Sequence, residues 1–348
     1  MFIQTIATAS YLPFVALMQE SVRRNVKVVS FSVLVTDAVP EDLNKIRARF
    51  PEDVVFVCCD DIPRPELSRM RKYYNVLEFN SACKVIMLDY QLREGKKDVL
   101  FLDPDIYACS DFSSFFTHCR KDILLTPHAL APYPEDGHGP TDMELAVAGQ
   151  INGGVIYFRD SSISREAAAW LAKKAEFFWF VAPLYGMYAD QQWLSLLPYY
   201  FPGATEVSRD TALNISYFNL HERQLDRSAA GSMLVDNKPA ALFHFSGFAV
   251  PSNGKMTCHT DRRFSRSNES VLSDLVRVYE QSFLNCRNLL QDCTGQLGFA
   301  NQSLEYRMAL AAQYSGRSYS PLFVCEDKAS SLAHKLKRKF LSLFKRKG

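Results

Sequence analysis

The sequence predicts an α/β fold with a mixed, mainly parallel β-sheet flanked by helices, followed by a helical C-terminal extension. Over the first 160 residues, short apolar segments rich in β-branched residues alternate with amphipathic segments of helical period. This alternation is typical of repeated βαβ units. After about residue 266 the pattern becomes helical.

Each element is expected from its local pattern. Strands are expected at residues 2–7, 27–36, 53–58, 98–102, 151–158 and 241–245, where the sequence is short and apolar. Helices are expected at residues 12–24, 82–93, 164–181, 190–197, 270–290 and 303–314, where apolar residues recur at helical spacing. The segment 126–149 is rich in Pro, Gly, His and acidic residues and is expected to be a long loop, of the kind that often binds ligands. We therefore divide the chain into an α/β domain (1–265), a helical extension (266–328) and a tail (329–348).

The composition is that of an ordinary globular protein. The chain has 348 residues, of which 47% are hydrophobic and 22% are charged, so it can bury a full core without disulfides. Its nine cysteines are scattered without a Cys-x-x-Cys pair, which indicates reduced thiols and argues against a zinc site. No apolar run reaches the roughly 18 to 20 residues of a membrane span, and the N-terminus lacks the features of a signal peptide. We therefore expect a cytoplasmic protein.

Asp103 and Asp105 directly follow the strand expected at 98–102, in the segment Leu-Phe-Leu-Asp-Pro-Asp. Ligands of open α/β sheets collect at the carboxyl ends of strands, and burying unpaired carboxylates in a core would be costly. Carboxylate oxygens suit Mg²⁺ or Mn²⁺, and such a cation can bridge a diphosphate. The Asp-x-Asp pattern alone also fits a solvated turn, so the neighbouring motifs have to decide.

Five short motifs occur in a fixed order along the chain. They are Lys84, Asp103-Pro-Asp105, Asn152-Gly153-Gly154, Asp190-Gln191 and His244-Phe-Ser-Gly247. Their order and spacing resemble the GT-A glycosyltransferases, most closely glycosyltransferase family 8 and related bacterial surface-polysaccharide transferases. The resemblance covers roughly residues 1–265 and implies a GT-A-like catalytic domain.

The resemblance implies a metal site. Asp103 and Asp105 would be the metal-binding pair, and His244 would be the third ligand. Because neutral imidazole suits Mn²⁺ better than Mg²⁺, we expect Mn²⁺, with Mg²⁺ as the alternative. Without the resemblance, His244 also fits a hydrogen-bonded histidine in a strand.

The resemblance further implies contacts to the donor sugar and its phosphates. Lys84 would meet the sugar or phosphate as a point charge; the alternative is a surface lysine. Asn152 would hydrogen-bond sugar hydroxyls, and Gly153 and Gly154 would let the backbone approach the ligand. The alternative for these three residues is a β-bulge.

Asp190 and Gln191 resemble the family's pair beside the reacting sugar carbon, in a family that retains the anomeric configuration. They would hold the donor sugar or stabilise its positively charged transition state. The alternative for Asp190 is a helix N-cap. Thr8 and Tyr11 follow the first strand, where the family holds the base and ribose.

One departure from the family concerns the grip on the diphosphate. In family 8 the His-x-x-Gly motif is followed by a Lys-Pro-Trp segment, which is missing after Gly247. Lys255, His259, Arg262 and Arg263 are the candidates to replace it, and Lys255 is the one we place in the donor site.

Two further segments have open interpretations. The polar segment 214–223 (NISYFNLHER) either lines the acceptor side or forms a structural hydrogen-bond network. His118, His128 and His138 lie in expected loops and are assigned no chemistry.

The last residues form a basic segment. The net charge of +2 includes seven basic residues after residue 334, so the rest of the chain carries −5, and we expect no nucleic-acid partner. In residues 330–348 one helical face is apolar and much of the remainder is basic, which suits an anionic membrane surface. The alternatives are a solvated basic tail or an RNA-binding one. A membrane position would place the protein peripherally at the inner face of the plasma membrane.

These patterns together predict a metal-dependent, retaining glycosyltransferase of bacterial surface-polysaccharide synthesis. It would move a sugar from a nucleotide-diphosphate donor, with a UDP-sugar favoured, to a hydroxyl of a glycan or lipid-linked acceptor. The alternatives are a sugar nucleotidyltransferase and a non-catalytic membrane scaffold. The first of these would need a glycine-rich phosphate loop after the first strand, where the sequence reads Ala-Thr-Ala-Ser-Tyr.

Overall fold

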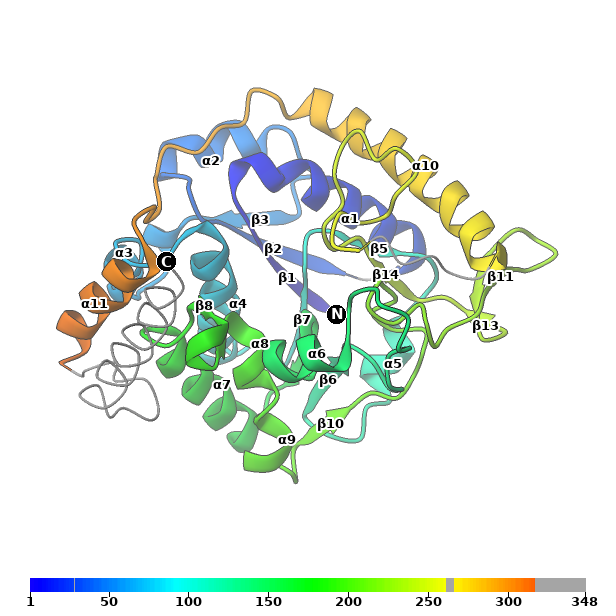
Figure 1. Cartoon of the computed structure of the whole chain (residues 1–348). Coiled ribbons are helices and arrows are strands. Elements are labelled where there is room, and N and C mark those ends of the chain that lie inside the picture. The colour runs from blue at the N-terminus through cyan, green and yellow to red at the C-terminus, as the bar shows by residue number, and fades with distance from the viewer. Residues whose placement is uncertain (28, 261–265, 317–348) are drawn as a thin grey trace, which may run out of the picture.

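The structure is a computed structural model that describes residues 1–27, 29–260 and 266–316. A seven-stranded sheet forms its centre (Figure 1). The strands lie in the order β10 (Thr205–Val207), β6 (Ile123–Pro127), β7 (Ile151–Arg159), β4 (Asp98–Leu102), β1 (Phe2–Ala7), β2 (Ser30–Val35) and β3 (Val54–Val57). Strand β7 is antiparallel to both of its neighbours, and the other four pairings are parallel. The mixed, mainly parallel sheet predicted from the sequence is therefore confirmed.

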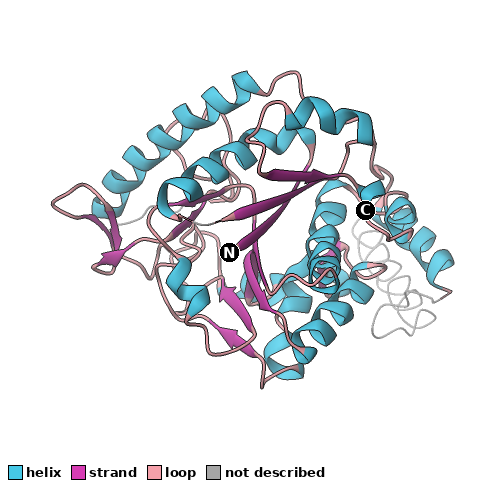
Figure 2. Cartoon of the chain, turned by 180° about the vertical axis from the view of Figure 1, so that it is seen from behind, coloured by secondary structure: helices cyan, strands magenta, loops and turns pink. Residues whose placement is uncertain are grey.

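Helices cover both faces of the sheet (Figures 1 and 2). Helices α1 (Leu12–Asn25) and α10 (Arg266–Leu289) pack together on one face. Helices α4 (Val76–Arg93) and α7 (Ser162–Ala175) pack together on the other. Successive side chains of a strand point to opposite faces. Strand β4 therefore contributes Leu100 and Leu102 to the hydrophobic core on one face of the sheet, and Val99 and Phe101 to the core on the other face.

The remaining elements are short. The helices are α2 (Pro40–Arg47), α3 (Glu66–Met70), α5 (Ser113–Thr117), α6 (Asp142–Ala148), α8 (Ala189–Leu194), α9 (Leu197–Tyr200) and α11 (Leu304–Ser315). The strands outside the main sheet are β5 (Ile106–Ala108) with β14 (Leu242–His244), β8 (Val181–Ala182) with β9 (Met187–Tyr188), and β11 (Leu225–Arg227) with β12 (Met233–Val235) and β13 (Lys238–Pro239).

Most predicted strands are confirmed to within a few residues, but three other expectations were wrong. The expected loop 126–149 begins as the end of β6 and contains α6, whose start is capped by Thr141. The helix expected at 164–181 ends at Ala175, and Val181 beyond it pairs with Tyr188. The helix expected at 190–197 divides into α8 and α9, since Pro198 can neither donate a hydrogen bond nor continue α8.

Two expectations about the chain as a whole can be compared with the structure. The eight cysteines within the described ranges are free thiols, and most are buried. No helix in those ranges is both long and apolar enough to cross a bilayer. The predicted tail (329–348), Arg262 and Arg263 lie outside the described residues.

A buried ion pair ties α11 to α4. Arg307 donates hydrogen bonds to Glu78, and the two side chains are 7% and 0% exposed. Glu78 also accepts from the backbone N–H groups of Asn75 and Val181, at 2.9 and 3.0 Å. One carboxylate therefore joins the start of α4, the start of β8 and α11.

We predict that Arg307→Met lowers the free energy of unfolding by about 3–5 kcal/mol, because it leaves the Glu78 charge buried without its partner. Urea unfolding followed by circular dichroism measures the change. Arg49→Met removes the solvent-exposed pair between Arg49 and Asp292 and is the control, with a much smaller expected change. Equal losses in the two variants would contradict the prediction.

Candidate metal and donor site

Two local pairings bring the candidate metal ligands together. Asp103 and Asp105 follow β4, and the Asp103 N–H donates to the Gly154 carbonyl at 2.9 Å. The chain then continues into β5, which pairs antiparallel with β14 so that Ile106 faces His244. The short β5–β14 ladder therefore carries His244, more than a hundred residues further along the chain, to the two aspartates.

The geometry of the three side chains suits a cation. Asp103, Asp105 and His244 each offer a ligand atom, and these atoms lie within 4.8 Å of one another. The His244 Nε2 is 3.2 Å from Asp105 Oδ1 and 3.9 Å from Asp103 Oδ2. Two carboxylates and one imidazole form a donor set that divalent first-row metals and Mg²⁺ accept. The three residues therefore fit the metal predicted from the sequence.

The same proximity shifts the pKa of each group. Burial, together with the charge of Asp105, raises the pKa of Asp103 despite the opposing effect of Lys84. Burial alone would raise the pKa of Asp105, but His244 outweighs it and lowers that pKa. Burial alone would lower the pKa of His244, but the carboxylate of Asp105 outweighs it and raises that pKa. The two carboxylates thus favour positive charge on the groups next to them.

Lys84 supplies part of that positive charge from α4. Its Nζ is 2.8 Å from Asp103 Oδ1 and 3.2 Å from Asp190 Oδ2, and it donates to the Gly153 carbonyl at 3.2 Å. Burial alone would lower the pKa of Lys84, but the charges of Asp103 and Asp190 raise it well above its usual value. The side chain is only 13% exposed, so Lys84 is not the surface lysine of the alternative interpretation.

The two glycines of the Asn-Gly-Gly segment are explained by close approaches. A Cβ on Gly153 would lie 1.9 Å from Asp190 Oδ2, and one on Gly154 would lie 2.5 Å from His244 Cε1 and 2.8 Å from Asn152 Oδ1. The pairing of β7 with β6 also shifts register between Leu125 and Thr126, opposite this segment. The strand pairing is therefore irregular at this segment, the position where a β-bulge was considered, and the glycines make room for His244 and Asp190.

Asp190 and Gln191 lie in α8, which packs against β7. Asp190 is 5% exposed and faces Lys84. The N-cap of α8 is Tyr188, which makes no side-chain capping bond, so the interpretation of Asp190 as a helix cap was wrong. The Oε1 of Gln191 is buried and has no hydrogen-bond partner within the described residues. This leaves Gln191 with an unused acceptor.

Thr8 and Tyr11 lie at the carboxyl end of β1, on the same edge of the sheet. Thr8 is buried, with its Oγ1 2.9 Å from Ser10 Oγ. Tyr11 is 48% exposed, and burial followed by the charges of Asp105 and Asp103 raises its pKa. Asp37, just beyond β2, accepts a hydrogen bond from the Ala9 N–H at 2.8 Å. Asp37 therefore lies just after the end of a strand, as Asp103 does, and this position is visible in the sequence.

Among the residues after β14, His259 lies against Gly247. Gly247 has a φ of +75°, and a Cβ there would lie 2.4 Å from His259 Nε2. Burial lowers the pKa of His259, with smaller effects of Asp105 and His244. Lys255 is exposed in a turn, where its N–H donates to the Ser252 carbonyl at 2.9 Å. Of the described candidates for the diphosphate grip, His259 is the one held against Gly247.

The polar segment 214–223 forms an internal hydrogen-bond network, one of the two interpretations left open by the sequence. Asn214, Ser216 and Asn219 are each 0% exposed. Asn214 accepts from His244 Nδ1, at 2.9 Å, and donates to Asn152 Oδ1, also at 2.9 Å. Asn152 Nδ2 in turn lies 3.3 Å from His128 Nε2. Asn214 and His128 were not assigned to the site from the sequence, because neither belongs to a recognisable motif.

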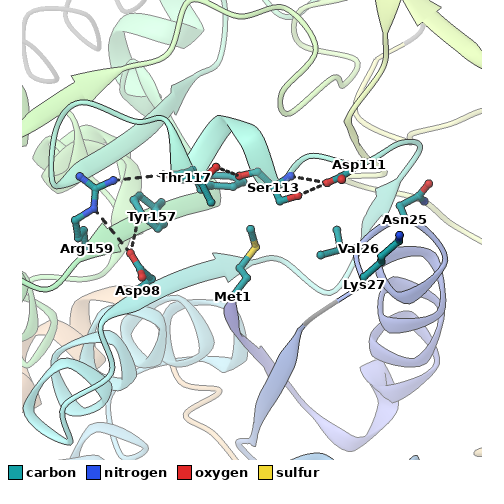
Figure 3. A pocket seen from close by; sticks show the side chains of 11 residues that line it. Met1, Asn25, Val26, Lys27, Asp98, Asp111, Ser113, Thr117, Tyr157 and Arg159 are labelled. Carbon is teal, nitrogen blue, oxygen red and sulfur yellow. Dashed lines mark hydrogen bonds and ion pairs between the residues drawn. The ribbon is translucent and has the colours of Figure 1, made fainter.

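A separate pocket of about 670 Å³ lies at the opposite edge of the sheet (Figure 3). Its lining includes Met1, before β1, and Asp98, at the start of β4. Polar groups in it contact one another or the backbone: Tyr157 Oη donates to Asp98 at 2.5 Å, and Arg159 Nη2 donates to the Cys119 carbonyl at 3.0 Å. None of the predicted site residues lines this pocket.

Comparisons with known proteins give weak similarities. No family model matches the sequence. The uncharacterized protein YfnF of Bacillus subtilis (strain 168) is 22% identical over 182 residues, which are 52% of this chain and 57% of YfnF. The chain therefore matches little more than half the length of this relative.

Three solved structures similar to the chain are glycosyltransferases, the class that the sequence resemblance implies. The galactosyltransferase LgtC, in complex with donor and acceptor sugar analogues, has a TM-score of 0.48 and 13% identity, covering 88% of this chain and 99% of LgtC. GlyE of Streptococcus pneumoniae TIGR4 has a TM-score of 0.43 and 12% identity, covering 84% and 62%. Mouse xyloside xylosyltransferase 1 has a TM-score of 0.41 and 13% identity, covering 70% and 96%. At such scores the function has to be argued from the site itself.

The buried His128 makes stability depend on pH. Burial lowers its pKa to about 4, whereas an unfolded histidine has a pKa of about 6.5. As the pH falls, the unfolded chain therefore binds this proton before the folded chain does. The contribution of His128 to the free energy of unfolding is fully present above about pH 6.5 and is lost as the pH falls towards about 4.

We predict that His128→Phe reduces the loss of unfolding free energy between about pH 7 and pH 4.5 by about 2–3 kcal/mol. Urea titrations of both proteins at the two pH values measure it. His118→Gln, which changes an exposed histidine, is the control and should leave the pH dependence as in the wild type. The same pH dependence in His128→Phe and the wild type would contradict the prediction.

Proposed function

We propose that the chain is a metal-dependent glycosyltransferase. It transfers a sugar from a nucleotide-diphosphate donor, a UDP-sugar by preference, to a hydroxyl of a glycan or lipid-linked acceptor in bacterial surface-polysaccharide synthesis. The observation that carries this proposal is the convergence of Asp103, Asp105 and His244 at the carboxyl edge of the sheet, with Lys84 and Asp190 held beside them.

Asp103, Asp105 and His244 would hold the cation. A mixed set of two carboxylates and one imidazole favours Mn²⁺ over Mg²⁺, since imidazole is the softer ligand. When bound, the cation neutralises negative charge on the diphosphate leaving group. This is the chemistry that sugar transfer from a nucleotide diphosphate requires.

The residues next to the cluster would bind and orient the donor sugar. Asp190 lies against Gly153 and contacts Lys84, which also contacts Asp103, so its carboxylate is close to the proposed cation. A carboxylate there stabilises positive charge that develops on the anomeric carbon. Gln191 can accept a hydrogen bond from a sugar hydroxyl through its unused Oε1. Thr8 and Tyr11 are the proposed contacts for base and ribose.

The product would retain the anomeric configuration, as the family resemblance implies. The alternative functions differ in the ligand they bind. A sugar nucleotidyltransferase would be stabilised by a nucleoside triphosphate, and a non-catalytic scaffold by no nucleotide. A thermal-shift screen of UDP and nucleoside triphosphates, with and without Mn²⁺, separates the three functions. Stabilisation by UDP with Mn²⁺ is the result that we expect.

We predict that Asp103→Ala weakens Mn²⁺-dependent UDP-sugar binding by at least ~100-fold, more than the loss of an outer-shell partner would. The variant removes one of the two charged ligands. Calorimetric titration of UDP-sugar in the presence of Mn²⁺ measures the effect. Asp98→Asn, at the other end of β4, is the matched control and should bind like the wild type. Unchanged binding by Asp103→Ala would rule out the proposed metal site.

The basic tail is the proposed contact with a membrane surface. Removing residues 329–348 should abolish cosedimentation with vesicles that contain phosphatidylserine, because each basic residue near such a surface contributes about 1 kcal/mol. Binding of the wild type should also decrease at high salt, and donor binding by the shortened chain should be unchanged. Equal cosedimentation of the two chains would contradict this prediction.

A further inference from the structure

The Nδ1 of His244 faces Asn214, on the side of the ring away from the aspartates. Asn214 Oδ1 lies 2.9 Å from His244 Nδ1. His244 is 3% exposed and Asn214 is 0% exposed, so water does not compete for this contact. How the amide of Asn214 is oriented therefore decides whether Nδ1 of the imidazole carries a proton.

A backbone group fixes that orientation. The N–H of Gly154 can only donate, and it donates to Asn152 Oδ1 at 2.8 Å. The atom of Asn214 that lies 2.9 Å from this oxygen must then be the amide nitrogen, because two carbonyl oxygens do not hydrogen-bond to each other. The same nitrogen donates to Thr126 Oγ1 at 2.8 Å. Asn214 therefore presents its oxygen to His244.

An oxygen acceptor at Nδ1 requires a proton on Nδ1. Nε2 is then the nitrogen that remains for a cation, on the side where Asp103 and Asp105 lie, at 3.9 and 3.2 Å. We propose that Asn214 is a positioning residue for the metal site, which holds the His244 imidazole in the Nδ1-protonated form and in the orientation that a cation needs. The inference rests on the metal site of the proposed function and deepens it.

The backbone holds Asn214 and His244 together as one unit. The His244 N–H donates to the Ile215 carbonyl at 2.7 Å, and the Ile215 N–H donates to the Leu242 carbonyl at 2.9 Å. Ser216 Oγ donates to the His244 carbonyl at 2.7 Å. Asn214 can therefore act on the ring without a change in the relative position of the two segments.

Asn214 also has an unusual backbone conformation. Its φ is +52°, a region that asparagine and glycine enter more readily than other residues. Glycine at this position would keep the backbone conformation and remove only the side chain. Asn214→Gly is for this reason the variant that removes the hydrogen bond to His244, together with those to Asn152 and Thr126, without straining the backbone.

This network gives Asn152 a role different from the sugar contact implied by the resemblance. Its Oδ1 is occupied by Gly154 and Asn214, and its Nδ2 lies 3.3 Å from His128 Nε2. Asn152 is 6% exposed. The Gly154 N–H therefore fixes the orientation of the Asn152 amide, and the Asn152 amide fixes the orientation of the Asn214 amide.

The first experiment titrates the metal-free chain with Mn²⁺ alone and with Mg²⁺ alone, by calorimetry. Asn214→Gly should weaken Mn²⁺ binding 10- to 100-fold, the range typical of outer-shell partners of metal ligands. Since Mg²⁺ depends less on imidazole, its affinity should fall less, and the preference for Mn²⁺ should decrease. A change limited to fold stability would not move this preference.

The control is Asn219→Ala. Asn219 is buried in the same loop and donates to the Asn214 carbonyl at 3.0 Å, but it does not contact the His244 ring. It should leave the Mn²⁺ preference within about threefold of the wild type. The inference is overturned if Asn214→Gly binds Mn²⁺ like the wild type, loses both metals equally, or matches the control. A wild-type chain that binds neither metal would instead remove the proposed metal site.

The second experiment needs no metal and works on the wild type. With ¹⁵N-labelled histidine, the Nδ1 of His244 should carry a proton that is protected from exchange, and Asn214→Gly should lose that protection. His244→Gln identifies the signal by its disappearance. A wild-type His244 with its only ring proton on Nε2 would overturn the inference, even if Asn214→Gly does not fold.

Discussion

Two carboxylates held together at the end of a strand repel each other, and much of the structure around β4 compensates that repulsion. Asp103 and Asp105 are separated by one residue and converge on one point with His244. Charges removed from water are stable only when paired. Lys84 reaches them from α4 and His244 from β14, so the groups that compensate the repulsion come from two different elements.

The compensation is local. Lys84 bridges Asp103 and Asp190, and Gly153 and Gly154 leave the space that the side chains of Asp190 and His244 occupy. A divalent cation adds charge of the sign that Asp103 and Asp105 need. The protein neutralises the negative charge of Asp103 and Asp105 only in part. The remaining negative charge is a physical basis for affinity towards a metal ion.

The polar residues behind the cluster orient the His244 ring and add no charge to it. Asn214, Asn152 and His128 form a chain of buried polar groups behind the His244 ring. Neutral amides and a histidine with a low pKa can fix an imidazole without adding a competing charge. Such a network is rigid because each buried member would lose a hydrogen bond on moving.

The sequence by itself determined the nature of the elements and the position of the aspartates. Strands at 2–7 and 98–102 follow from apolar periodicity, and an Asp pair after a strand marks the ligand edge of the sheet. These are local properties, readable over a few residues. The family resemblance added His244, Lys84 and Asp190, and the structure brings all three beside the pair.

Only the tertiary structure decided which polar side chains meet. Lys84 and Asp190 are 106 residues apart in the chain, and Asn214 and Asn152 are 62 apart. Their contacts depend on strand order, on the register shift between β6 and β7 at Thr126 and on the pairing of β5 with β14. No local pattern encodes these features, because they result from the packing of the whole sheet. The sequence located the candidate site, and the packing of distant segments determined its geometry.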